Sequence, residues 1–198
     1  MTIPSWILPA TSPNLTPTPY PRHRLHMILH LAIFLCTLVA MECVGFLAHK
    51  YVMHGPGWFL HRSHHEPHLG VVETNDVYLL ILALVAITLI VLGNAGHDPL
   101  QWVGAGVAAF GIIYVFVHDG IVHRHWPVRP KPRHPYLRRL YQAHLMHHAI
   151  KGRRNSVSFG FLYAPPVHVI KRQLREMRES EARVEDRREG DFLDEARG

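Results

Sequence analysis

The sequence predicts an all-α integral membrane protein, a helical bundle with a histidine-rich site for two metal ions on one side of the bilayer. Three observations support this class. Long uncharged runs alternate with stretches that hold nearly all of the charge, although only 18% of the 198 residues are charged overall. The chain contains 18 histidines, and histidine is the commonest metal ligand. Most of these histidines follow or precede an apolar run, so we expect them at the ends of membrane helices.

The chain is expected to divide into three parts. Residues 1–25 form a flexible leader, because the first 21 residues hold six prolines among Ser, Thr and Asn. Residues 26–170 form the membrane-embedded domain. Residues 171–198 form a charged C-terminal tail that mixes eight basic with nine acidic side chains, which is typical of a solvated helix or a disordered segment.

Three apolar segments are expected to span the membrane. Met27–Ala48 has about 22 residues, which exceeds the core of a signal peptide and suits a spanning helix. Val77–Leu92 and Leu100–Val117 are shorter and are separated by a turn that contains Gly96 and Pro99. They are expected to form a helical hairpin in lipid.

The distribution of positive charge predicts the orientation. The turn of the hairpin carries no Lys or Arg, whereas the segments that follow the first and third spans carry 19 of the 21 basic residues. By the positive-inside tendency, the turn is external and the histidine-rich segments are cytoplasmic. Three spans would place the N-terminus outside. A fourth span would have to lie in Val157–Ile170, which is short and contains two prolines.

The net charge of +6 raises nucleic acid as a class of partner. Most of the excess basic charge lies in Arg124–Arg154, next to the third apolar segment. A membrane surface explains that position better, so we expect a lipid bilayer as a partner and no nucleic acid.

The two cysteines limit the metal chemistry. Cys36 and Cys43 lie seven residues apart in the first span, and we expect them to be buried small hydrophobic residues without a disulfide. A thiolate site would need more cysteines than these. Any metal must therefore be held by imidazole and oxygen.

Four histidine clusters repeat one pattern, H-x-x-x-x-H followed by H-x-x-H-H. Spacings of three and four residues place each triplet on one helix face, so each is expected to aim three rings at one point. The pairs five residues apart are separated by about 140° on an ideal α-helix and need a helix end or two adjacent metals. Ten imidazoles are too many for one ion and predict a two-metal centre. The candidate ligands are His49, His54, His61, His64, His65, His118, His123, His144, His147 and His148.

Glu42 is the only acidic residue in a predicted span, which makes it a candidate for function. It lies seven residues before His49 on nearly the same helix face, and about 10 Å of helix rise makes it too distant to be a ligand. We expect Glu42 to accept a hydrogen bond from a histidine or a water near the metals. The alternative is a protonated Glu42 paired with another span.

Four segments carry a resemblance to a known family: HKYVMHGPGWFLHRSHHEPH, HDGIVHRHWPVR, RRLYQAHLMHH and SFGFLYAPP. Over about Met27 to Lys171 the chain resembles the bacterial β-carotene 3-hydroxylases, which belong to the fatty acid hydroxylase superfamily of non-haem di-iron membrane oxygenases. The resemblance implies two iron ions, O₂ as oxidant, and electrons from NAD(P)H through ferredoxin and its reductase. It also implies hydroxylation of β-carotene at ring carbons 3 and 3′ to zeaxanthin through β-cryptoxanthin, in the bacterial inner membrane. The ten candidate histidines match the ligand motifs of that family.

Three alternatives stay open at this point. A carotenoid 4-ketolase, or a sterol or fatty-acyl oxidase of the same superfamily, would use the same type of centre. A metal transporter or sensor would use the histidines as a relay and would need ionisable residues along the spans. Only His30 and Glu42 lie within them, which disfavours transport.

Overall fold

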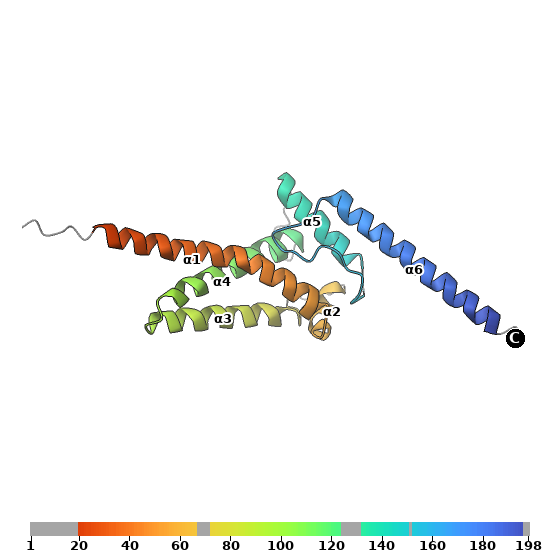
Figure 1. Ribbon diagram of the computed structural model, residues 1–198, viewed down its shortest axis with the longest axis horizontal. Helices are drawn as coiled ribbons and strands as arrows, with labels where there is room; N and C mark the ends of the chain where they lie inside the picture. Colours follow the sequence, from red (N-terminus) through yellow and green to blue (C-terminus); the bar gives the residue numbers. More distant parts are fainter. Residues whose placement is uncertain (1–19, 67–71, 124–131, 151, 196–198) are drawn as a thin grey trace, which may run out of the picture.

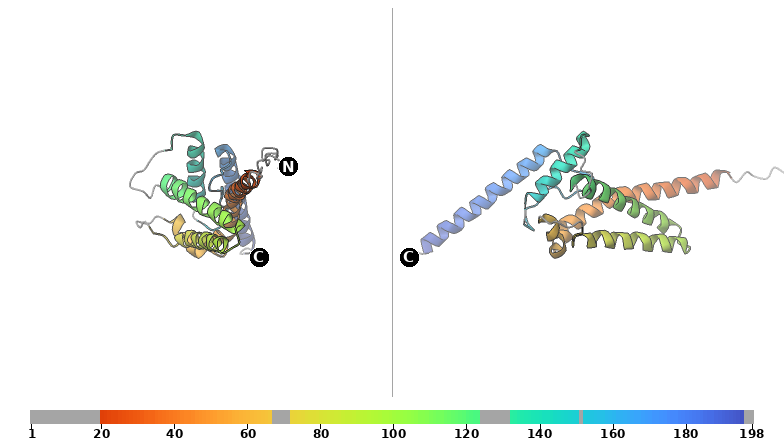
Figure 2. Two further views of the ribbon diagram at one scale, coloured as in Figure 1. Left: turned by 90° about the vertical axis from the view of Figure 1, so that its left-hand side faces the viewer. Right: turned by 180° about the vertical axis from the view of Figure 1, so that it is seen from behind.

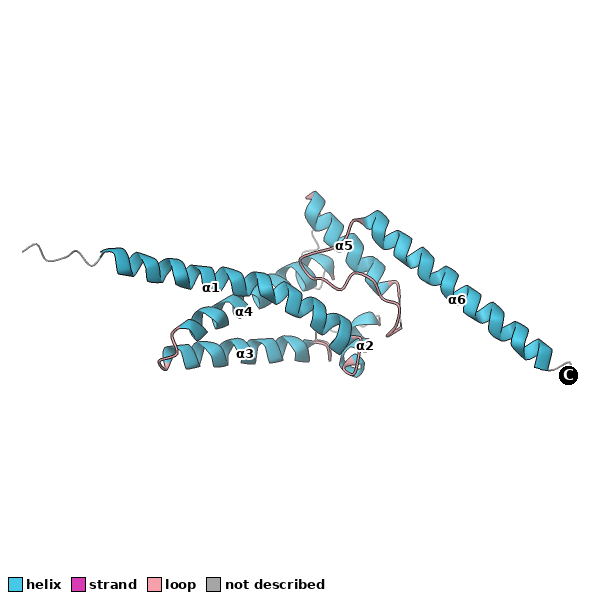
Figure 3. Ribbon diagram, in the orientation of Figure 1, coloured by secondary structure: helices cyan, strands magenta, loops and turns pink. Residues whose placement is uncertain are grey.

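The computed structural model describes residues 20–66, 72–123, 132–150 and 152–195, and in these ranges all regular structure is helical (Figure 3). Two of the elements, η2 and η3, are short π-helices that continue the α-helices before them. The elements are α1 (Tyr20–Leu47), η2 (Ala48–Met53), α2 (Trp58–His65), α3 (Asp76–Asn94), α4 (Pro99–Tyr114), η3 (Val115–Val122), α5 (Pro135–His148) and α6 (Val167–Glu195). Residues 1–19 of the predicted leader lie outside the described residues, and α1 begins at Tyr20, inside the last part of that leader.

Three helical segments are long and apolar enough to cross a membrane: His23–Met53, Asp76–Asn94 and Pro99–Val122. They contain the three predicted spans and extend each of them, so the protein has the helices of a membrane protein. Among the described residues no fourth such helix is found. Residues 157–166 form a loop instead.

Helix α4 is the middle helix of the bundle and packs against both α1 and α3 (Figures 1 and 2). Two glycines allow this close approach. A Cβ at Gly104 would lie 2.8 Å from the carbonyl oxygen of Ala86 in α3, and one at Gly106 would lie 2.9 Å from that of Phe34 in α1. Small residues at such contacts are typical of membrane helices, which associate by close packing rather than by the hydrophobic effect.

The two cysteines of α1 are exposed on the protein surface, which contradicts the prediction that they are buried. The physical reason is that α1 packs mainly against α4, so most of its circumference is free to face lipid. A small apolar side chain such as cysteine is as compatible with lipid as with a protein core.

Helix α6 shows that the C-terminal segment is a helix and that its first turns belong to the folded domain. Ile170 is fully buried in a cluster with Leu140 and Ala143 of α5. Leu174 and Met177 pack against the same cluster, beyond the predicted boundary at residue 171. The rest of α6 extends away from the bundle and is charged and exposed (Figure 1).

Candidate metal centre

All ten candidate histidines meet at one end of the bundle, opposite the turn between α3 and α4. They come from the η2 turn, α2, the η3 turn and α5. Eight of the ten are buried, and His123 and His148 are half-buried. The sequence therefore predicted correctly that these side chains converge.

The pairs five residues apart are brought together by π-helical turns. The amide of His54 donates to the carbonyl of His49 at 3.0 Å, and the amide of His123 donates to that of His118 at 2.8 Å. This i to i+5 hydrogen bonding is that of a π-helix, which is rare and is found frequently at functional sites. The wider turn places the fifth residue above the first, so the two rings of each pair lie 5.2 Å and 4.5 Å apart. The separation of about 140° expected for an α-helix does not apply.

The histidines form two groups, and within each group one ring nitrogen of every member lies within 4.8 Å of the others. The five-histidine group consists of His49, His54, His61, His65 and His147. The four-histidine group consists of His64, His118, His123 and His144. The ring of His148 lies between the groups, with its centroid 4.4 Å from those of both His65 and His144.

Each predicted triplet is divided between the two groups, which corrects the expectation that a triplet points at one site. His61 and His65 are four residues apart and lie on the same face of α2. His64 directly precedes His65, and its side chain is rotated by about 100° around the helix axis from that of His65. In α5, His147 belongs to the five-histidine group and His144 to the four-histidine group. Both α2 and α5 therefore lie between the groups and contribute to each.

The ring nitrogens that face each other cannot be joined by ordinary hydrogen bonds. Nδ1 of His54 lies 3.1 Å from the carbonyl oxygen of Arg153, and Nδ1 of His147 lies 2.8 Å from that of Val157. A carbonyl only accepts, so each Nδ1 carries the proton and each Nε2 keeps a lone pair. These two Nε2 atoms lie 3.2 Å apart in a buried setting. Two lone pairs at this distance need a cation between them.

The same spacing recurs within the five-histidine group. Nε2 of His61 lies 3.2 Å from Nε2 of His49 and 3.3 Å from Nε2 of His65. Two nitrogen ligands of a tetrahedral ion with bonds of about 2.0–2.1 Å lie about 3.3 Å apart. The spacing of these nitrogens therefore fits the ligands of one ion.

Burial keeps these imidazoles unprotonated. Desolvation lowers the pKa of His61 to about 4. It also lowers the pKa of His65 to about 3 and that of His148 to about 2, with neighbouring imidazoles adding to the effect. Nε2 of His64 and Nε2 of His148 are buried and have no hydrogen-bond partner. Neutral, buried and unpaired imidazole nitrogens fit a bound metal and are costly without one.

Polar residues around the four-histidine group and α2 were missed by the sequence analysis. Nδ1 of His64 lies 3.1 Å from a carboxylate oxygen of Glu73, and Nδ1 of His118 lies 2.7 Å from one of Asp119. Nδ1 of His61 lies 2.7 Å from the side-chain oxygen of Asn75. Such partners fix the ring and direct Nε2 inward. Asp119 could have been found from the sequence, because it directly follows His118. Glu73 and Asn75 lie just before the second span, and no sequence pattern marks them.

Comparison with known proteins identifies the family. Residues 34–164 match the family model described as Fatty acid hydroxylase. The chain is 53% identical over 149 residues to a protein of Pantoea ananas named Beta-carotene hydroxylase, which covers 75% of this chain and 85% of the relative.

This chain belongs to the fatty acid hydroxylase family. A protein of the same name from Pseudescherichia vulneris is 47% identical, over 76% of this chain and 85% of the relative. The chloroplastic Beta-carotene 3-hydroxylase 1 of Arabidopsis thaliana is 40% identical, over 71% of this chain and 46% of the relative. No solved structure matches the chain.

In this member of the fatty acid hydroxylase family, Glu42 makes other contacts than those expected. Its Oε1 accepts hydrogen bonds from the amides of Phe161, Leu162 and Tyr163 at 2.9–3.0 Å, and Oε2 accepts one from Leu162. The partner is a loop, neither a histidine nor a residue of another span. The same loop contacts His49 directly, because Nδ1 of His49 donates to the carbonyl of Phe159 at 2.9 Å. Glu42 is thus linked to the histidines through the loop.

Several other histidines lie away from the centre. His97, His134 and His168 are exposed. His30 lies near the turn between α3 and α4, where its Nε2 is 2.8 Å from a carboxylate oxygen of Asp98. His68 and His125 lie outside the described residues.

Proposed function

We propose that this protein hydroxylates β-carotene at ring carbons 3 and 3′, forming zeaxanthin through β-cryptoxanthin, with two iron ions held by the ten histidines. The observation that carries the proposal is the pairing of inward Nε2 lone pairs at ligand spacing in two adjacent groups. The names of the bacterial and plant relatives support the substrate. A centre of neutral imidazoles suits iron, and oxygen chemistry favours iron over zinc.

The roles of the residues follow from their positions. We assign one ion to the five-histidine group, the other to the four-histidine group, and His148 to the space between them. When bound, the iron pair would supply the activation of O₂ and the oxidation of a ring C–H bond. The aromatic rings around the histidines exclude water from this chemistry. Phe161 stacks on His49 with centroids 5.1 Å apart, and Tyr114 stacks on His118 at 4.5 Å.

The reaction requires reducing equivalents. Each hydroxylation consumes the carotenoid, O₂, two electrons and two protons, and gives the alcohol and water. We propose that the electrons come from NAD(P)H through ferredoxin and ferredoxin reductase. A soluble donor must reach the histidine end of the bundle, and the charge distribution favours a cytoplasmic position for that end in a bacterial inner membrane.

Expression in a host that accumulates β-carotene tests the proposed function, with the pigments identified by chromatography. We expect zeaxanthin as the main product and β-cryptoxanthin as a minor one. Echinenone or canthaxanthin as the main product would instead identify a 4-ketolase. Unchanged β-carotene with full iron loading and a supplied reductant would contradict carotenoid oxidation altogether.

The metal is tested on purified protein. We expect about two irons per chain after anaerobic loading. Activity should require both O₂ and a reductant, and chelation should abolish it. Turnover by metal-free protein or with zinc alone would contradict the oxygenase chemistry.

A further inference from the structure

An apolar pocket lies between α1 and α3, next to the histidines. It has a cavity volume of about 320 Å³ and is lined by side chains of α1, α3 and α4. Val44 of α1, Val85 of α3 and Phe110 of α4 all line it. Helix α4 packs against both α1 and α3, which holds these two helices on either side of the pocket.

The pocket is open toward the lipid-facing surface of the bundle. Val44 is 51% exposed and Val85 is 45% exposed, although both line the cavity. Both residues belong to segments that are apolar and long enough to cross the membrane. A molecule dissolved in the bilayer can therefore enter between α1 and α3 without passing through water.

The inner end of the pocket contacts the supports of both histidine groups. Asn75 and Asp119 line the pocket, and they lie 2.7 Å from Nδ1 of His61 and of His118, respectively. The rings of Phe161 and Tyr114 also line it and stack on His49 and His118. An occupant therefore contacts side chains that touch histidines of both groups.

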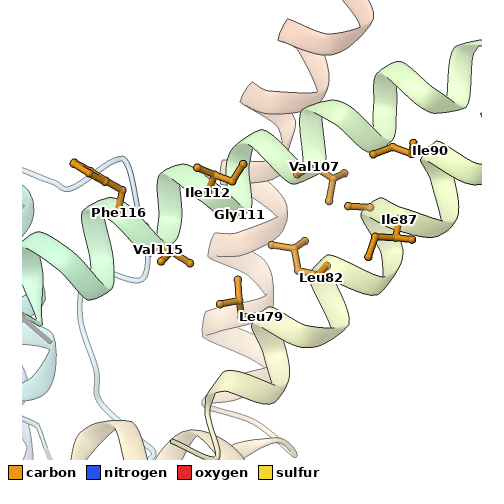
Figure 4. Close-up of a pocket in the computed structure, with 12 residues that line it drawn as sticks. Leu79, Leu82, Ile87, Ile90, Val107, Gly111, Ile112, Val115 and Phe116 are labelled. Atoms are coloured by element: carbon orange, nitrogen blue, oxygen red, sulfur yellow. The ribbon is translucent and has the colours of Figure 1, made fainter. Parts of the chain in front are cut away.

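A second apolar groove between α3 and α4 provides a contrast (Figure 4). Its cavity volume is larger, about 470 Å³, and Ile87 of α3 and Ile112 of α4 line it. Neither lining contains a histidine, but the groove between α3 and α4 also lacks the four residues, Asn75, Tyr114, Asp119 and Phe161, that connect the first pocket to the histidines. Proximity to the histidines, rather than size, therefore distinguishes the pocket between α1 and α3.

We propose that the pocket between α1 and α3 binds one ring end of the carotenoid, which enters from the bilayer while the rest of the polyene stays in lipid. This inference rests on the proposed function. Ligand pockets start at about 300 Å³, so this cavity holds a ring and a short part of the chain but not the whole molecule. Only one ring can reach the centre at a time. The singly hydroxylated product must leave and re-enter with its other end.

The first test fills the pocket. Val44→Trp and Val85→Trp place a large side chain at its two rims, whereas Ile87→Trp and Ile112→Trp do the same in the groove between α3 and α4. All four positions are 45–71% exposed, so folding and iron content should be unchanged. We expect kcat/KM for β-carotene to fall at least about tenfold in the pocket variants, the scale on which a hydrophobic pocket discriminates small differences in shape. The control variants should stay within about twofold of the unmodified protein.

Retention of β-carotene during purification separates this inference from the proposed function. Loss of the pigment from the pocket variants alone supports the pocket, even if the product of the unmodified enzyme were a ketone. If the unmodified protein hydroxylates β-carotene and all four variants match it, the pocket holds only bilayer lipid and the inference is wrong.

A labelling experiment tests whether the singly hydroxylated product leaves the pocket before its second ring is hydroxylated. Labelled β-carotene is converted in the presence of excess unlabelled β-cryptoxanthin. We expect the label to accumulate in β-cryptoxanthin and to be diluted in zeaxanthin, because the intermediate is released between the two hydroxylations. Undiluted label in zeaxanthin would show that both rings react in one binding event, which would overturn the model of one ring at a time.

Discussion

The two histidine groups differ in the partners of the outer ring nitrogens, which are seen for four rings of one group and two of the other. In the five-histidine group these partners are uncharged. His49 faces the carbonyl of Phe159, and His54 faces that of Arg153. His147 faces the carbonyl of Val157, and His61 faces the amide oxygen of Asn75. In the four-histidine group, the carboxylates of Glu73 and Asp119 face His64 and His118.

This difference makes the two proposed iron positions inequivalent. A carboxylate partner raises the basicity of an imidazole ligand and adds negative charge near the ion. The four-histidine group is therefore the better site for the more positively charged iron. The five-histidine group depends instead on the loop after α5, which supplies three of its four outer partners. One position is supported by charge and the other by the folding of a loop.

Removing a ligand from each group should have the largest effect. We expect His147→Ala and His64→Ala to retain about one iron and to lose hydroxylation by more than the 10- to 100-fold typical of outer contacts. Iron content and zeaxanthin yield measure the result. His97→Ala and His168→Ala, at exposed positions, serve as controls and should keep most of the activity. Normal yield from either ligand variant would count heavily against a shared centre.

Acid pH should release the metals and destabilise the metal-free protein. The pKa values of His61 and His65 are lowered from 6.5 to about 4 and about 3. Below pH 6.5 the unfolded chain binds protons that the folded chain rejects, so stability falls as the pH drops from about 6.5 toward 4. The melting temperature of the metal-free protein measures this trend.

The release of iron over the same pH range tests the comparison between the groups. We expect two steps, with the four-histidine group keeping its ion to lower pH because the buried carboxylate of Glu73 lies beside His64. The iron content after equilibration at each pH measures the steps. Release in a single step would show that the carboxylates do not distinguish the two positions.

Neutralising the carboxylates should have a smaller effect than removing ligands. Glu73→Gln and Asp119→Asn keep the shape of the side chain and remove its charge, so we expect activity to fall about 10- to 100-fold. Asn75→Asp is the matched variant, because it adds a carboxylate beside His61 in the other group. We expect it to retain more activity and to change the spectroscopic signature of one iron. Equal losses of activity in all three variants would show that the carboxylates do not make the two iron positions different.

The sequence predicted much of this architecture because two of its signals are local. Apolar runs long enough to cross a bilayer identify the three spans without any tertiary information. The repeated histidine pattern at their ends identifies the nine histidines of the two groups and His148 between them. Both signals can be read from the sequence because each depends only on residues that are close together along the chain.

The grouping of the histidines could not be predicted in the same way. The π-helical turns of η2 and η3 replace an α-helical periodicity that the sequence alone would suggest. The partners of Glu42 lie about 120 residues away in an irregular loop, and no periodic pattern marks them. Contacts of this kind depend on the tertiary fold.

Glu42 provides the smallest and most specific test, because it acts on the five-histidine group only through the loop. Its carboxylate accepts the amides of Phe161, Leu162 and Tyr163, and the same loop supplies the carbonyl of Phe159 to His49. Glu42→Leu removes every acceptor. We expect hydroxylation to fall by about tenfold, the lower end of the range for outer contacts, with iron lost from the five-histidine group first.

Glu42→Gln separates charge from hydrogen bonding, because it keeps an oxygen that can accept the three amides. We expect it to retain more activity than Glu42→Leu. Hydrogen exchange of the amides of Phe161 and Leu162 should rise in Glu42→Leu and change little in Glu42→Gln, which a general loss of stability would not produce. His30→Leu is the control on the same helix, since His30 pairs with Asp98 at the end of the bundle opposite the histidines and should not affect the iron. If Glu42→Leu keeps its iron, its rate and its amide protection, the loop is held by packing alone and Glu42 has no positioning role.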